Sequence, residues 1–105
     1  MTDWYTVMDK ILFAQDAERW AIAEAASEEL VEQITIQDID GLLAEYPKWK
    51  YRYILAWVAG HKGEDALSTL YYLARDENLD VKEEAEKWIS ELVPPPPEPE
   101  QLKMF

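Results

Sequence analysis

The chain contains no cysteine, so it can form neither disulfide bonds nor thiolate metal sites, and this composition fits a reducing compartment. It has only three glycines, which build no phosphate-binding loop. A single histidine limits the options for acid–base catalysis. No apolar run has the length that crossing a bilayer requires. We therefore expect a protein that is not an enzyme and that holds no metal or cofactor.

The 105 residues suffice for one folded domain with a short tail. Residues 1–93 carry the hydrophobic segments and are expected to fold as a helical body. Residues 94–100 form a proline-rich linker, and residues 101–105 form a separate apolar peptide. The first residues, Met1 to Trp4, show no basic or apolar part of a secretory signal. We expect a cytoplasmic protein that does not associate with membranes.

Acidic residues dominate the charge, with a formal net charge of −12. Basic residues are concentrated in residues 46–62, which contain four bases and no acid. Because a strongly acidic surface repels the phosphate backbone, the composition disfavours general nucleic-acid binding. Only the basic middle segment could approach DNA.

Hydrophobic residues recur with helical periodicity along the whole body, and no segment alternates as a strand would. The pattern predicts an all-α fold. Trp20 is expected on the buried face of the second helix, together with Leu30 and Ile34. The stripes lie in residues 4–12, 20–34, 36–46, 49–59, 66–74 and 81–92.

Capping and turn residues mark the expected helix ends. Thr35 and Asp38 are spaced as a capping box at the start of the third helix, and Asp80 with Glu83 has the same spacing before the last. Pro47 is expected to end the third helix. The sequence of residues 60–63, Gly-His-Lys-Gly, predicts a turn after the fourth.

An internal repeat favours stacked helix pairs over an irregular bundle. Leu43-Ala44 and Leu73-Ala74 are offset by 30 residues, as are Tyr51-Arg52 and Val81-Lys82. Residues 64–92 resemble a HEAT repeat of the short type found in phycobilin-lyase-like proteins, and residues 36–60 resemble it less closely. The resemblance implies about three helix pairs followed by an extended proline-rich tail. It also implies a concave surface that binds protein or, in some members, DNA.

No group of side chains has the composition of a catalytic or metal site. His61 lies in the predicted turn without a periodic carboxylate partner, and we interpret it as a turn residue. The acidic clusters at 28–32 and 83–86 lie opposite the apolar stripes, which is typical of solvated helix faces.

Basic and aromatic residues alternate in the middle of the chain, a composition that can hold a nucleic-acid backbone or an acidic protein surface. Alternatively, the aromatic residues pack while the bases are solvated or pair with nearby acids. The residues of this possible second binding surface are Lys48, Trp49, Lys50, Arg52, Tyr53 and Trp57.

The sharpest motif is the sequence Gln-Leu-Lys-Met-Phe at residues 101–105. Residues 94–100, if extended as polyproline II, would hold this peptide roughly 20 Å from the body. The peptide resembles the bacterial sliding-clamp-binding motif, Gln-Leu-(Ser or Asp)-Leu-Phe. The resemblance implies that Gln101 bonds to the groove edge, that Leu102 fills a small site, and that Met104 and Phe105 fill a deep apolar pocket. Lys103 departs from the consensus at a tolerant position.

These features lead to the hypothesis of an adaptor or regulator in DNA replication or DNA repair. It would dock on the DNA polymerase sliding clamp through Gln101, Leu102, Met104 and Phe105 and could inhibit or redirect use of the clamp. Two alternatives remain. One is a general HEAT-like protein-binding module, such as an immunity or assembly factor, whose tail straps back on the body. The other is a HEAT-like repair protein that binds nucleic acid through the basic segment.

Overall fold

The computed structural model describes residues 3–93, and every regular element in this range is helical. The predicted all-α class is therefore confirmed. The proposed linker 94–100 and peptide 101–105 lie outside the described residues. The elements are α1 (Trp4–Asp16), α2 (Trp20–Gln33), α3 (Ile36–Ala44), α4 (Trp49–Lys62), the 3₁₀ turn η1 (Gly63–Ala66), α5 (Leu67–Leu73) and α6 (Leu79–Leu92).

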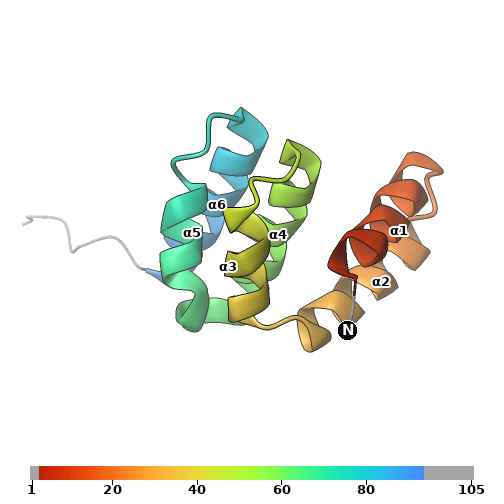
Figure 1. Cartoon of the computed structure of the whole chain (residues 1–105), viewed down its shortest axis with the longest axis horizontal. Helices are drawn as coiled ribbons and strands as arrows, with labels where there is room; N and C mark the ends of the chain where they lie inside the picture. Colours follow the sequence, from red (N-terminus) through yellow and green to blue (C-terminus); the bar gives the residue numbers. More distant parts are fainter. Residues whose placement is uncertain (1–2, 94–105) are drawn as a thin grey trace, which may run out of the picture.

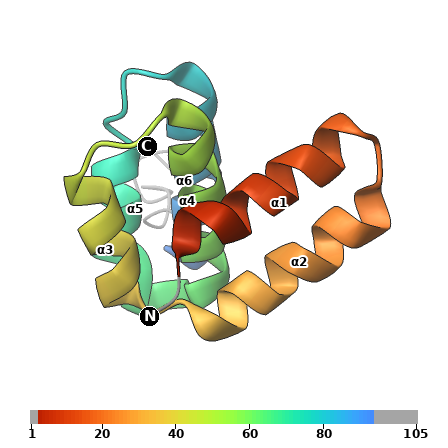
Figure 2. The same ribbon diagram turned by 45° about the vertical axis from the view of Figure 1, so that its right-hand side comes forward.

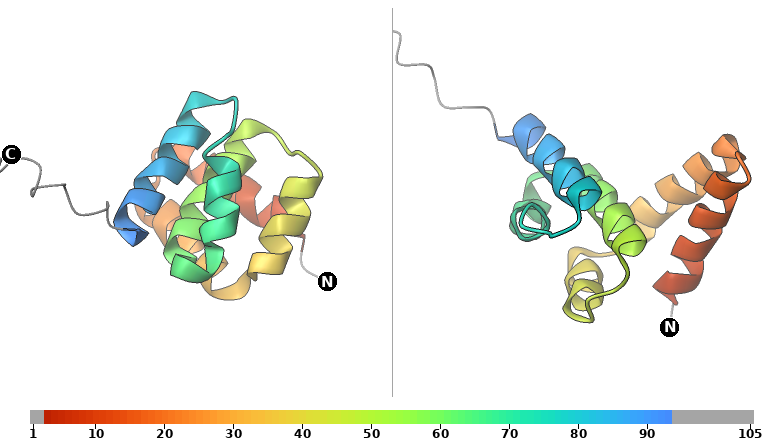
Figure 3. Two further views of the ribbon diagram at one scale, coloured as in Figure 1. Left: turned by 90° about the vertical axis from the view of Figure 1, so that its left-hand side faces the viewer. Right: turned by 90° about the horizontal axis from the view of Figure 1, so that it is seen from above.

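The helices follow one another as three hairpins, α1–α2, α3–α4 and α5–α6 (Figure 1). This arrangement is compatible with a helical repeat. Helix α4 is central, since it contacts each of the other α-helices. Seen from above, α2, α4 and α6 lie along one side of the molecule, while α3 and α5 lie on the other (Figure 3). None of the helices within residues 3–93 is both long and apolar enough to span a membrane.

The hydrophobic core surrounds α4, whose buried face combines large and small side chains. Leu55 and Val58 are fully buried, and so are Ala56 and Ala59, which let neighbouring helices approach closely. The other helices and the end of α2 cover this face with hydrophobic residues that are each less than 9% exposed: Met8, Ile11, Leu30, Ile34, Ile39, Leu42, Leu43, Leu70, Leu73 and Val81.

Local capping explains where two of the helices begin. The Thr35 side chain accepts a bond from Asp38 N at 3.0 Å, and the Asp38 carboxylate accepts one from Thr35 N at 3.0 Å. The predicted capping box of α3 is therefore confirmed. The box predicted at Asp80 is wrong, because α6 already begins at Leu79 and Asp80 lies within its first turn. Asn78 caps this helix through a bond from Val81 N to its Oδ1 at 3.2 Å.

The predicted turn at residues 60–63 is also wrong in its extent. Helix α4 continues through Gly60 and His61 to Lys62, and only Gly63, with φ of 83°, adopts the left-handed conformation that favours glycine. Gly60 has another reason to be glycine. A Cβ atom at this position would overlap the indole ring of Trp88, so α4 and α6 are close together because Gly60 has no side chain.

The α1–α2 hairpin is attached to the other helices through its end nearest α3. The Tyr5 hydroxyl donates to Glu45 at 2.9 Å, and the Tyr51 hydroxyl donates to Asp9 at 2.5 Å. The rings of Tyr5 and Tyr51 also meet edge to face, with centroids 5.2 Å apart. From there the hairpin extends away from the remaining helices (Figure 2). Its turn therefore projects outward and leaves one side of α4 uncovered.

Candidate interaction surface

The sequence-predicted residues fall into two groups with different outcomes. Gln101, Leu102, Met104 and Phe105 lie outside the described residues, so the clamp motif stays a prediction. The second group, predicted from the basic and aromatic segment, lies on the first turns of α4 and just before it.

Helix α4 presents a stripe of aromatic side chains at intervals of four residues. Trp49, Tyr53, Trp57 and His61 therefore lie along one face of the helix. Trp49 and Tyr53 are 39% and 37% exposed, His61 is exposed, and Trp57 is half-buried. Lys48 and Lys50 are exposed beside this stripe. Five of the six predicted surface residues are thus accessible and close together.

Arg52, the sixth residue, does not belong to this surface. Its side chain is 6% exposed and forms an ion pair with Asp76, with Nε 2.7 Å from Oδ2 and Nη2 3.0 Å from Oδ1. Its Nη1 donates to the Pro47 carbonyl at 2.6 Å, and the Tyr46 ring lies over the guanidinium at 4.6 Å. The expectation that Arg52 contacts a partner is corrected. Two of its N–H groups are already bonded to Asp76 in the loop before α6, and they join that loop to α4.

Because of this ion pair, the free energy of unfolding depends on pH in the acid range. Burial would raise the pKa of Asp76, but hydrogen bonds from the Arg52 side chain and the Asn78 backbone N–H outweigh it, so this pKa is lowered. A lowered folded-state pKa means that ionised Asp76 stabilises the fold above its unfolded pKa of about 3.9. This contribution is lost as the pH falls through the folded pKa.

We therefore expect the free energy of unfolding to fall more steeply with acidification below about pH 4 in the wild type than in Asp76→Asn, which has no carboxylate to titrate. Urea unfolding at a series of pH values, followed by circular dichroism, measures both slopes. Equal slopes in the two proteins would contradict the role assigned to Asp76.

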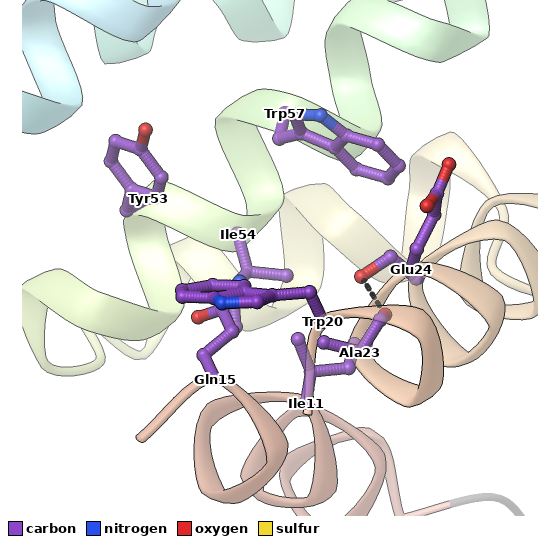
Figure 4. Close-up of a pocket in the computed structure, with 9 residues that line it drawn as sticks. Ile11, Gln15, Trp20, Ala23, Glu24, Tyr53, Ile54 and Trp57 are labelled. Atoms are coloured by element: carbon purple, nitrogen blue, oxygen red, sulfur yellow. Dashed lines mark hydrogen bonds between the residues drawn. The ribbon is translucent and has the colours of Figure 1, made fainter. Parts of the chain in front are cut away.

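A cleft of about 440 Å³ lies between the α1–α2 hairpin and the aromatic stripe of α4. In Figure 4, Trp20 from α2 lies below the opening, while Tyr53 and Trp57 from α4 lie above it. Ile54 and Glu24 are also labelled around this space. We call it the aromatic cleft; it is lined by Ile11, Gln15, Trp20, Ala23, Glu24, Ser27, Tyr53, Ile54 and Trp57.

A second hollow of about 280 Å³ lies beside the aromatic cleft, near the start of α4. The two spaces share Gln15 and Tyr53, so they adjoin at these residues. The second hollow adds charged groups of both signs. It is lined by Leu12, Gln15, Asp16, Trp49, Lys50, Tyr53 and Asp80.

The aromatic side chains of α4 are held from the α6 side. The Tyr53 hydroxyl and Trp88 Nε1 both donate to the buried carboxylate of Glu84, at 3.3 and 2.6 Å. Burial and the neighbouring Glu84 carboxylate raise the pKa of Tyr53, which keeps its hydroxyl a hydrogen-bond donor. His61 lies between Trp57 and Trp88, with ring centroids 3.9 and 4.6 Å away. The cleft wall formed by α4 is therefore supported by a second layer of contacts.

The chemistry of this surface suits binding. Within residues 3–93, no group of three or more histidine, aspartate or glutamate side chains could hold a metal ion. Around the cleft are indole and phenol faces, which belong to residue types enriched at protein interfaces, together with one amide and scattered charges.

Sequence reasoning identifies only half of the cleft. The apolar pattern places Trp20 on the buried face of α2, but this residue is 61% exposed and faces α4 across the opening. Nothing in the pattern singles out Gln15 or Glu24. One signal is present, since Trp20, Glu24 and Ser27 are spaced by four and three residues and therefore share a helix face. The face that carries Trp20, Glu24 and Ser27 adjoins the buried face of α2.

No protein-family model matches the chain, and neither a curated protein nor a solved structure matches it.

Proposed function

We propose that this protein is an adaptor that docks on the bacterial DNA sliding clamp through residues 101–105, while its helical body binds a second protein. The observation that carries the proposal is the sequence Gln-Leu-Lys-Met-Phe following a proline-rich segment. Such a role places the protein in the cytoplasm, beside replicating or repaired DNA. The three helix hairpins are interpreted as HEAT-like repeats, which commonly bind protein partners.

Each position of the peptide has a physical role in this proposal. Leu102, Met104 and Phe105 supply apolar surface to preformed pockets, and Gln101 supplies an amide for the rim. The prolines before them restrict the unbound chain, which lowers the entropy lost on binding. Lys103 is expected to point away from the clamp, in accordance with the variability of that position.

The body supports the proposal in two ways. Within residues 3–93, its core cluster draws on all three hairpins, so this part of the chain has a hydrophobic core of its own. Its aromatic cleft offers a second contact surface. A short peptide alone typically binds with micromolar affinity, and a second contact on the same assembly raises the overall affinity.

The proposal predicts that Leu102→Ala together with Phe105→Ala abolishes binding of the full chain to purified clamp. Two lost anchors at about 2 kcal/mol each correspond to a fall in affinity of roughly a thousandfold. Surface plasmon resonance on immobilised clamp measures this change. Lys103→Ala is the matched control and is expected to bind as the wild type does.

Circular dichroism of the double variant is expected to match the wild type, since the helices and the core cluster described above lie between Trp4 and Leu92. Clamp binding by the double variant at wild-type strength would refute the docking proposal.

A protein-binding module that acts without the clamp is the second candidate, and the aromatic cleft is the observation that favours it. A nucleic-acid role has less support. The burial of Arg52 leaves Lys48 and Lys50 as the exposed bases of the predicted binding surface, and Asp16 and Asp80 line the same hollow as Lys50.

A further inference from the structure

We infer that the aromatic cleft is the docking site for a basic peptide segment of a second protein, with an arginine or lysine side chain inserted between Trp20 and Trp57. This inference names the chemistry of the second partner and in that respect rests on the proposed adaptor role. Its test uses no clamp, so the cleft assignment and the adaptor role can fail separately.

The walls of the cleft suit a cationic side chain. Trp20 and Tyr53 offer exposed aromatic surface, and Trp57 offers a half-buried ring on the α4 side (Figure 4). Cations are attracted to the faces of such rings, and tryptophan is the strongest of them in this respect. A guanidinium or ammonium group entering the cleft would therefore meet aromatic surface from both α2 and α4.

The charges around the cleft favour the same occupant. Glu24 is exposed at the cleft, and within residues 3–93 it takes part in no ion pair. Asp16 and Asp80 line the adjoining hollow together with one base, Lys50, so acids outnumber bases there. With a chain of net charge −12, the long-range field also attracts a basic segment.

The remaining lining residues accommodate the aliphatic part of the ligand. Ile11, Ala23 and Ile54 are buried, apolar and at the cleft. The methylene groups of lysine or arginine, or a neighbouring leucine, can pack against them while the charge reaches Glu24. A volume of about 440 Å³ is sufficient for a few side chains rather than for a whole helix.

Other occupants fit this chemistry less well. A second copy of the chain brings the same negative charge, and nucleic acid brings phosphates that the nearby carboxylates repel. The proline-rich segment of this chain could contact aromatic rings, but it carries Glu98 and Glu100 and would place acid next to Glu24.

The test is a selection from a phage library of random dodecapeptides on the immobilised full-length chain, followed by fluorescence anisotropy with the most enriched peptide. We expect the enriched sequences to combine arginine or lysine with an aliphatic residue. Trp20→Ala and Glu24→Lys are each expected to weaken binding of that peptide at least tenfold. The affinity is also expected to fall as salt is added.

Matched controls lie on the same helix. Ile22→Ala removes an exposed apolar side chain, and Glu28→Lys reverses an exposed charge, but neither residue lines the cleft. Both variants are expected to bind the peptide as the wild type does. Loss of binding in Glu28→Lys to the same degree as in Glu24→Lys would show attraction to overall charge. Such a loss in either control would overturn the assignment to the cleft.

Three further outcomes would overturn the inference: no enrichment over the bare support, enrichment of acidic or purely proline-rich sequences, and tighter binding of single-stranded oligothymidine than of any enriched peptide. The variant Leu102→Ala/Phe105→Ala is expected to select the same peptides as the wild type. If this variant and the wild type both fail to bind clamp while peptide selection succeeds, the adaptor role fails and the cleft assignment stands.

Discussion

Replacing Arg52 with alanine is expected to lower the free energy of unfolding by about 3–5 kcal/mol, because it leaves the carboxylate of Asp76 buried without its partner. Both side chains of the pair are at most 6% exposed. The same change removes the donor to the Pro47 carbonyl and the cation over the Tyr46 ring. For a domain of this size, the melting temperature is expected to fall by more than about 10 °C.

Lys50→Ala is the matched control for this prediction. Lys50 is a base two residues away on the same helix, but it is exposed and forms no ion pair within residues 3–93. Its removal is expected to change stability by less than about 0.5 kcal/mol. Urea unfolding followed by circular dichroism compares the two. An Arg52→Ala protein as stable as Lys50→Ala would mean that the pair with Asp76 contributes nothing to the fold.

Substituting alanine for Gly60 is expected to destabilise the protein, although alanine is the better helix former. The added Cβ would overlap three ring atoms of Trp88, namely Cγ, Cδ2 and Cε2, so α4 and α6 would have to separate. Overpacking of this kind costs typically about 1–3 kcal/mol. We expect it to outweigh the gain in helix propensity, which is about 1 kcal/mol.

Gly41 provides the control for Gly60. It also lies within a helix, α3, but a Cβ atom added there would meet nothing within 4 Å beyond the backbone of its own helix. Gly41→Ala is therefore expected to stabilise the protein by up to about 1 kcal/mol. Thermal unfolding followed by far-ultraviolet circular dichroism gives both values. A rise in melting temperature for Gly60→Ala similar to that for Gly41→Ala would contradict the close contact with Trp88.

Gly60 also illustrates how far the sequence predicts the fold. The periodicity of apolar residues indicates helices throughout, and the capping box at Thr35 fixes the start of α3 correctly. Glycine has two uses that a sequence pattern does not separate, however. It permits a turn, as at Gly63, and it permits close approach of two helices, as at Gly60. Only the partner helix distinguishes them.

The interaction surface is predictable only in part, for a related reason. A run of basic and aromatic residues indicates a possible surface on α4, but it does not tell which base points inward. Arg52 does so because Asp76, 24 residues later, lies within reach of its guanidinium. The pattern places Trp20 in the core because a large apolar residue beside a buried stripe usually packs there. The outward tilt of the α1–α2 hairpin exposes it instead (Figure 2).

The proposed clamp docking is tested most directly by titrating purified bacterial sliding clamp into a fluorescein-labelled peptide covering residues 94–105. Saturable binding with a dissociation constant in the micromolar range is predicted, and the same peptide with alanine at positions 102 and 105 is predicted not to bind. Absence of binding by the wild-type peptide, or equal binding by both peptides, would contradict the proposal.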